Sequence, residues 1–204
     1  RPSLRLMASG HPGLTRKTVD RLFGELRDFS LPFLDRLRSA PLQPKQLRFQ
    51  DIFPQDQQRQ LCIEILSDIG FDFSRGRMDV SAHPYTTAND RDDVRFTTRY
   101  ENDSFIPALI SCTHEGGHGM HGQNSRLSLR YTTLENAHYD AICESQSRYI
   151  ENVIAHSEEF WEYCLPRAQK YFPSLSAFSP RQIWESLCAL QFDPSRMKCD
   201  ELTY

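Results

Sequence analysis

The sequence lacks the features typical of membrane-spanning and nucleic-acid-binding chains. It has no apolar run near the roughly 20 residues needed to cross a bilayer, and its mean hydropathy is −0.58. Lys and Arg together number 24 against 27 Asp and Glu, a net charge of −3. No global basic field is therefore available to neutralise nucleic-acid phosphates. We expect neither a membrane span nor a nucleic-acid partner.

Three further absences concern compartment and organisation. The six cysteines form no Cys-x-x-Cys pair, which favours reduced thiols and a cytoplasmic location in a chain of this length. The first residues hold too little contiguous apolar sequence for a signal peptide and lack an initiator methionine, so we expect the chain to be cut at this end. Internal repeats and low-complexity stretches are missing as well.

Apolar residues at helical spacing run through most of the chain. One stripe follows Thr15 and continues beyond Pro32, and a second helix is expected from Pro54 to a stop at Gly70. Further helices are predicted around Phe160–Ala168 and after the pair Ser179-Pro180. The composition and periodicity predict a mainly helical protein.

One region departs from helical spacing. A period of two runs through residues 94–100, which predicts a half-buried strand: Val94, Phe96, Thr98 and Tyr100 alternate with Arg95, Thr97 and Arg99. Residues 77–82 are the expected partner, joined through a polar loop at 86–92. The fold class predicted is therefore mainly α, with a small antiparallel β-sheet before the helix that carries the next motif.

That motif is His114-Glu115-Gly116-Gly117-His118. Histidines four residues apart project from one face of a helix, so two imidazoles can bind one Zn²⁺. Glu115 can then act as general base on a water that the metal polarises. The alternative is a helix with two partly buried histidines and a solvated glutamate.

Two features favour the metal over that alternative. Glu144 lies on a helix predicted from 134 to 154, and a polar loop would let this helix fold back antiparallel and place Glu144 opposite the histidines. The glycines at 116, 117 and 119 each cost a helix about 1 kcal/mol relative to alanine, which fits a helix that must pack closely in a cleft.

Several ordered motifs carry a resemblance to a known family. They are His83-Pro84-Tyr85, the Asp-x-Arg-x-Thr run at Asp93, Arg95 and Thr97, the motif at 114–118, Glu144-Ser-Gln146, and the stretch from Arg196 to Tyr204. Together they resemble the carboxypeptidase Taq family of zinc metallocarboxypeptidases. The resemblance covers residues 77–204 well and the part before residue 75 more loosely.

The resemblance implies a role for each matching residue. His114, His118 and Glu144 would bind Zn²⁺, which Co²⁺ or Mn²⁺ could replace, and Glu115 would be the catalytic base and acid. Arg196 would bind the terminal carboxylate of a peptide substrate, and His83 would line the substrate site. Asp93 and Arg95 share one strand face and are expected to brace the site as an ion pair, and Gln146 is expected to orient its neighbours. The Cys143 thiol could support the metal, compete for it or contribute nothing.

The sequence also departs from the family pattern. Cys143 stands where the family usually has a histidine, His121 stands at a usually aromatic position, and the motif helix is richer in glycine. Members of the family are longer at both ends and carry a last conserved motif that is absent here, so we expect this chain to be truncated at both ends.

These observations predict one partial catalytic domain over 1–204, with a helical lead-in at 1–75 and a zinc-site region at 76–204. The predicted function is removal of C-terminal residues from peptides, with a homodimer as one oligomeric state. The alternatives are a truncated, non-catalytic relic acting as a binding module and a structural helical protein with a chance motif.

Overall fold

The computed structural model describes residues 11, 13–41, 44, 46–132, 134–135 and 140–189. The chain divides into two compact units, Leu47–Trp184 and a unit formed by Arg1–Gln46 with Glu185–Tyr204. The described part of the second of these contains α2 (Arg16–Arg38), which passes through Pro32 and is capped by the Thr15 hydroxyl. Large apolar side chains of α2 are exposed, among them Phe23 and Phe29.

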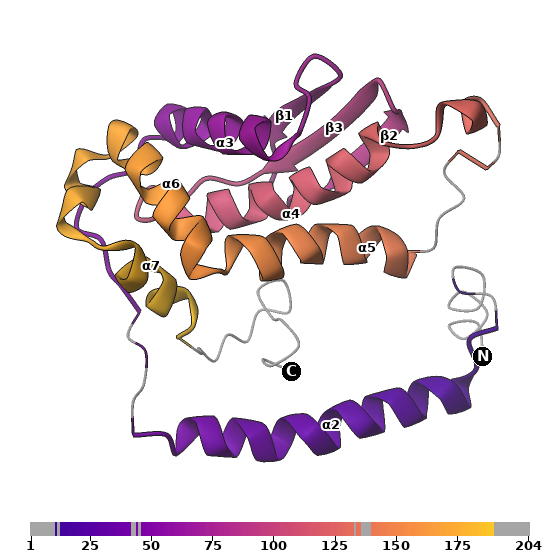
Figure 1. The fold of residues 1–204 in the computed structure, drawn as a ribbon, viewed down its shortest axis with the longest axis horizontal. Helices are drawn as coiled ribbons and strands as arrows, with labels where there is room; N and C mark the ends of the chain where they lie inside the picture. Colours follow the sequence, from indigo (N-terminus) through magenta and orange to yellow (C-terminus); the bar gives the residue numbers. More distant parts are fainter. Residues whose placement is uncertain are drawn as a thin grey trace. The chain divides into compact units, whose positions relative to one another are not determined.

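The unit Leu47–Trp184 carries most of the described helices (Figure 1), and the predicted mainly helical fold class is confirmed. The helix α3 ends where predicted, because Gly70 adopts the left-handed conformation (φ +116°) and caps it. The helices of this unit in chain order are α3 (Gln55–Ile69), α4 (Ile106–Gln123), the 3₁₀ helix η1 (Leu127–Leu129), α5 (Asp140–Arg148), the π-helix η2 (Tyr149–Ala155), α6 (Glu158–Tyr171), the 3₁₀ helix η3 (Pro173–Ala177) and the first residues of α7 (Pro180–Leu187).

A small sheet precedes α4, but its pairing differs from the prediction. The strands are β1 (Gly76–Val80), β2 (Thr86–Asp90) and β3 (Asp93–Thr98), in the order β1-β3-β2. The segment expected as a loop is itself the strand β2, antiparallel to β3, whereas β1 pairs with β3 in parallel. The prediction of an antiparallel β1–β3 pair was wrong. The antiparallel partner of β3 is β2, which lies on the side of β3 opposite β1.

The helix α4 lies at the centre of this unit. Its Cys112 Sγ is 3.5 Å from Met78 Sδ of β1, and Val94 and Phe96 of β3 are buried toward it. The helices α3 and α5 pack against other faces of α4, and α5 runs antiparallel to it (Figure 1). The predicted antiparallel return of the helix that carries Glu144 is thus confirmed.

Aromatic rings fill the core at the start of α4. Phe53 lies between Phe105 (centroids 5.4 Å apart) and Phe172 (4.9 Å), and Phe105 also contacts Trp161 of α6. Trp161 is fully buried, and its indole N–H donates to the Ala155 carbonyl. These contacts join the ends of α4, η2 and α6, so the helices that carry the motif are held by one core. Among the described helices, none combines the length and apolar character that a bilayer span requires.

Candidate metal centre

Glycines set the distance between α4 and its neighbours. A Cβ atom on Gly117 would lie 2.7 Å from Ser147 Cα of α5, and one on Gly116 would lie 2.5 Å from a Leu66 methyl of α3. No larger side chain fits at Gly117 without moving backbone. The predicted reason for these glycines, close packing of the motif helix, is confirmed.

This close packing brings three side chains to one point. His118 Nε2 lies 3.0 Å from Glu144 Oε2, and His114 Nε2 lies 3.8 Å from Glu144 Oε1. One donor atom of each residue lies within 4.8 Å of the others. The two imidazoles meet nearly at right angles, with centroids 4.9 Å apart. The structure therefore assembles the three residues expected to bind metal.

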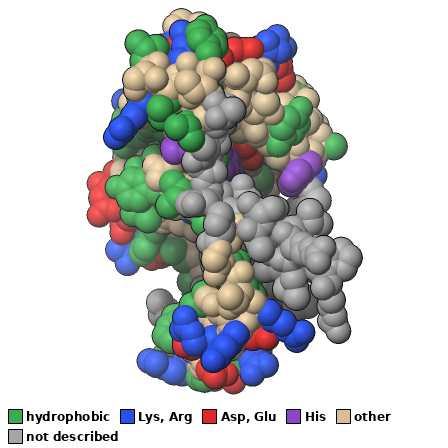
Figure 2. Space-filling view, turned by 90° about the vertical axis from the view of Figure 1, so that its right-hand side faces the viewer, with side chains coloured by type: hydrophobic (Ala, Val, Ile, Leu, Met, Phe, Trp, Pro, Cys, Tyr) green, Lys and Arg blue, Asp and Glu red, His purple; other side chains and the backbone are tan. Residues whose placement is uncertain are grey.

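The arrangement fits a tetrahedral divalent ion. Ligands about 2.0–2.1 Å from such an ion lie roughly 3.4 Å from one another. His118 Nε2 is 3.0 Å from one oxygen of Glu144 and His114 Nε2 is 3.8 Å from the other, so a small side-chain movement would bring one donor atom of each residue to this spacing. Two imidazole nitrogens and a carboxylate are also a common donor set for catalytic zinc, leaving a fourth position open. The side chains of His114 and His118 remain 18% and 16% exposed. Figure 2 shows where histidine side chains of the protein as a whole reach one of its faces.

The second nitrogen of each imidazole also has a partner. His114 Nδ1 lies 2.7 Å from Glu151 Oε2 of η2, and His118 Nδ1 lies 3.2 Å from Cys143 Sγ. Arg148 links the acidic residues, with Nε 3.5 Å from Glu144 Oε1 and Nη1 3.2 Å from Glu151 Oε2. Partners of this kind fix the orientation of metal-binding histidines.

The two histidines differ electrostatically. Burial lowers the pKa of His114, but the hydrogen bond and charge of Glu151 outweigh burial, so the pKa is raised overall. Burial and the nearby charge of His114 lower the pKa of His118. Burial opposes ionisation of Glu151, yet its hydrogen bond with His114 gives it a lowered pKa. His114 and Glu151 therefore form a charge-assisted pair.

Glu115 faces the sheet beside this cluster. Its side chain is buried, and the Thr86 hydroxyl of β2 lies 2.6 Å from Glu115 Oε2. Burial raises the pKa of Glu115 above its usual value, and the Thr86 hydrogen bond partly offsets the rise. The charges of His114 and His83 also lower the pKa of Glu115, whereas the charge of Glu144 raises it. A carboxylate with a raised pKa next to a metal site suits proton transfer.

The remaining predicted residues are exposed, face away from α4, or lie outside the described residues. His83 is exposed in the turn before β2. Asp93 and Arg95 form a two-point ion pair (2.7 and 3.0 Å) on the face of β3 opposite Val94 and Phe96, which pack toward α4. Gln146 is exposed and donates to Ser145. Arg196 lies outside the described residues.

Glu151 is the residue that sequence reasoning missed. It lies seven residues after Glu144, so two helical turns return it to the same face, toward α4. That spacing was a usable signal once the orienting partner that metal-bound histidines need was considered. The signal was weak by itself because acidic residues are common on exposed helix faces.

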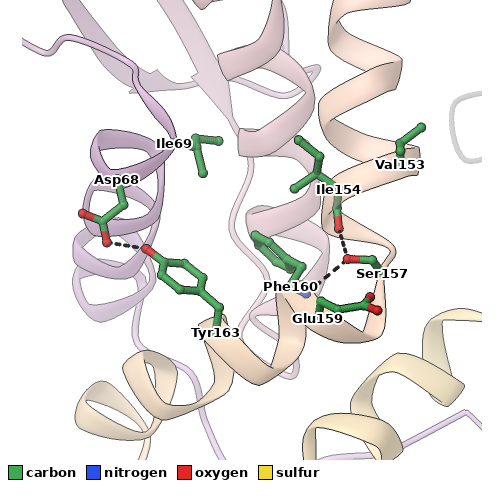
Figure 3. A pocket seen from close by; sticks show the side chains of 8 residues that line it. All are labelled: Asp68, Ile69, Val153, Ile154, Ser157, Glu159, Phe160 and Tyr163. Carbon is green, nitrogen blue, oxygen red and sulfur yellow. Dashed lines mark hydrogen bonds between the residues drawn. The ribbon is translucent and has the colours of Figure 1, made fainter.

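A separate open hollow of about 560 Å³ lies between α3, η2 and α6 (Figure 3). One side carries the hydrogen bond between Tyr163 and Asp68, and the other carries Val153 and Ile154. Its lining shares no residue with the histidine cluster. The hollow is therefore distinct from the candidate metal centre.

A His-Glu-x-x-His helix packed against a helix that supplies a glutamate is typical of metallopeptidases. The sequence model of the family described as carboxypeptidase Taq (M32) metallopeptidase matches residues 5–204. The chain belongs to this family, as the resemblance implied.

Individual relatives support the assignment. The chain is 35% identical over 201 residues to carboxypeptidase 1 of Bacillus subtilis, covering 95% of this chain and 39% of that protein. It is 33% identical to thermostable carboxypeptidase 1 of Thermus thermophilus, covering 98% of this chain and 39% of that protein. The crystal structure of the M32 carboxypeptidase from Deinococcus radiodurans R1 matches with a TM-score of 0.91 at 29% identity, and the match covers 100% of this chain and 41% of that chain. The chain thus spans about two fifths of these relatives.

Proposed function

We propose that this chain carries the metal site of a zinc-dependent metallocarboxypeptidase, which removes C-terminal amino acids from peptides. The observation that supports the proposal is the convergence of His114, His118 and Glu144, with both Nε2 atoms near the glutamate and both Nδ1 atoms partnered. A second support is membership of a metallopeptidase family. The three residues are proposed to hold Zn²⁺, with Co²⁺ or Mn²⁺ as substitutes.

The bound ion would polarise the scissile carbonyl and lower the pKa of a water molecule. Glu115 would accept the proton of the attacking water at its carboxylate and deliver it to the leaving amine. Thr86 would hold one carboxylate oxygen, leaving the other to act in proton transfer. His83, whose charge reaches Glu115, is proposed to line the site for the peptide.

Exopeptidase selectivity needs a cation for the terminal carboxylate of the substrate, and Arg196 is proposed for this role on the family motif it matches. A guanidinium can bind a carboxylate through two parallel hydrogen bonds. The proposed partners are therefore peptides, and neither nucleic acid nor membrane. A homodimer and a cytoplasmic location complete the proposal.

Peptide cleavage tests this function directly. The zinc-loaded chain should release single C-terminal residues from a test peptide, and both a chelator and Glu115→Gln should abolish release. A blocked C-terminus on the same peptide should also prevent cleavage, because the terminal carboxylate is part of the recognition.

The alternative is a non-catalytic module that binds metal, and Cys143, which stands where the family usually has a histidine, favours it. In that case the chain would bind zinc without releasing residues from any peptide, and Glu115→Gln would change nothing. A chain that binds no zinc would contradict both functions.

A further inference from the structure

Glu151 is a largely buried acidic group of η2 whose side chain contacts the candidate metal centre. That side chain is 16% exposed, against 48% for Glu144. A buried carboxylate is costly unless it is paired, and Glu151 Oε2 is paired twice, with His114 Nδ1 at 2.7 Å and with Arg148 Nη1 at 3.2 Å. The π-helix η2 places it there, directly beyond the end of α5.

We propose that Glu151 is a positioning residue that holds His114 in the tautomer and orientation needed for metal binding. The presence of a metal ion at this site rests on the proposed function. A carboxylate can only accept a hydrogen bond, so the proton of the neutral imidazole must be on Nδ1. The lone pair is then on Nε2, the nitrogen that faces Glu144. Glu151 thereby selects the nitrogen that is free to bind the ion.

Arg148 extends this arrangement to both acidic residues. Its guanidinium contacts Glu151 through Nη1 and Glu144 through Nε, at 3.2 and 3.5 Å. One cation thus lies between the carboxylate that orients His114 and the carboxylate proposed to bind the ion. The guanidinium offsets the repulsion between these two negative charges and keeps both directed toward α4.

His118 has a different partner on its Nδ1 nitrogen. That nitrogen lies 3.2 Å from the Cys143 thiol, a weaker hydrogen-bonding group than a carboxylate. Because the two histidines depend on different partners, removal of Glu151 should act on His114 and leave the tautomer of His118 unchanged. This selectivity separates positioning from a general loss of negative charge.

Two measurements on the full chain test the proposal. The first is zinc affinity, from competition between the protein and a chelator for Zn²⁺ alone. The second is the tautomer of each histidine in the metal-free protein, from proton–nitrogen correlation spectra at a pH where the imidazoles are neutral. The variants are Glu151→Ala, the conservative Glu151→Gln, and Glu159→Ala as a matched control on an exposed carboxylate of α6.

We expect Glu151→Ala to weaken zinc binding about 10–100-fold, the loss typical of an orienting partner, and to release the His114 proton from Nδ1. Glu151→Gln keeps an acceptor oxygen, so it should lose less affinity and retain the Nδ1 proton. Glu159→Ala should match the wild-type chain in both measurements. If Glu151→Ala does not fold, the zinc affinity of Glu151→Gln and the tautomer of His114 in the wild-type chain test the proposal instead.

An Nε2 proton on His114 in the wild-type chain would overturn the proposal, as would a Glu151→Ala variant with unchanged affinity and tautomer. A loss of affinity without a change of tautomer would also overturn it, because it would show a charge effect alone. If the wild-type chain binds no zinc, the proposed function fails, and the tautomer still tests the role of Glu151 independently.

Discussion

Gly117 of α4 packs against the backbone of Ser147 of α5, so that a Cβ atom at Gly117 would stand 2.7 Å from Ser147 Cα. The contact lies one residue before His118 and three residues after Glu144. The separation of the two helices at this point therefore sets how close the histidines come to the glutamate. Glycine at position 117 lowers the stability of the helix α4, but it lets α5 approach closely enough to form the site.

Gly117→Ala should push α5 away from α4. We expect a loss of about 1–3 kcal/mol in the free energy of unfolding, because a backbone atom must move, together with weaker zinc binding. Urea denaturation measures the first effect and chelator competition the second. Gly24→Ala in α2 is the control: its added methyl meets nothing within 4 Å, so it should stabilise by about 0.5–1 kcal/mol. A Gly117→Ala chain with unchanged zinc affinity would contradict this account of the glycine.

Glu144→Ala should weaken zinc binding by more than the roughly 100-fold that loss of an outer partner can cause, because it removes a proposed ligand. Glu115→Gln should leave zinc binding unchanged, since Glu115 serves proton transfer and is not a proposed ligand of the ion. The control is Ser145→Ala, a change at the exposed residue next to Glu144. Equal zinc affinities in Glu144→Ala and the control would remove Glu144 from the site.

Thr86→Val should move the acid limb of the kcat/KM profile to higher pH. The Thr86 hydroxyl stabilises the ionised form of Glu115 and lowers its pKa, whereas burial raises it. Without the hydroxyl the pKa rises further, so the base becomes protonated, and activity is lost, at a higher pH. Thr87→Val, on the exposed face of β2, should leave the profile unchanged. Coincident acid limbs for Thr86→Val and Thr87→Val would contradict the role of Thr86.

Asp72 should contribute stability that disappears in acid. The Ser74 hydroxyl and the Arg75 guanidinium lower the pKa of Asp72 from 3.8 to about 2. A lowered carboxyl pKa stabilises the folded chain above the ordinary pKa, and this stability is lost as the pH falls through the folded value. The difference between wild type and Asp72→Asn in urea denaturation should thus be constant well above the ordinary pKa of 3.8 and vanish as the pH falls toward about 2. A difference that grows in acid would contradict the assignment.

The sequence predicted the elements that depend on local spacing. His114 and His118 are four residues apart, so they share one helix face wherever the helix begins. Gly70 ends α3 through its own backbone conformation. The third residue of the cluster, Glu144, required only that the next long helix fold back. These features follow from periodicity and chain direction.

Features that depend on long-range pairing were not predicted. The β2 segment, Thr86–Asp90, is polar and lacks apolar alternation, so nothing local distinguishes it from a loop; its partner β3 makes it a strand. The parallel β1–β3 pairing likewise depends on where the chain returns. Glu151 was missed for the same reason, since its function arises only from the contact with His114.

The position of the bound ion tests the central claim most directly. Crystals of the zinc-loaded chain should show one anomalous-scattering peak at the zinc edge, about 2.0–2.2 Å from His114 Nε2, His118 Nε2 and a carboxylate oxygen of Glu144. A zinc-loaded crystal with no peak at this point, or with a peak bound by other residues, would contradict the claim that these three side chains form the metal centre.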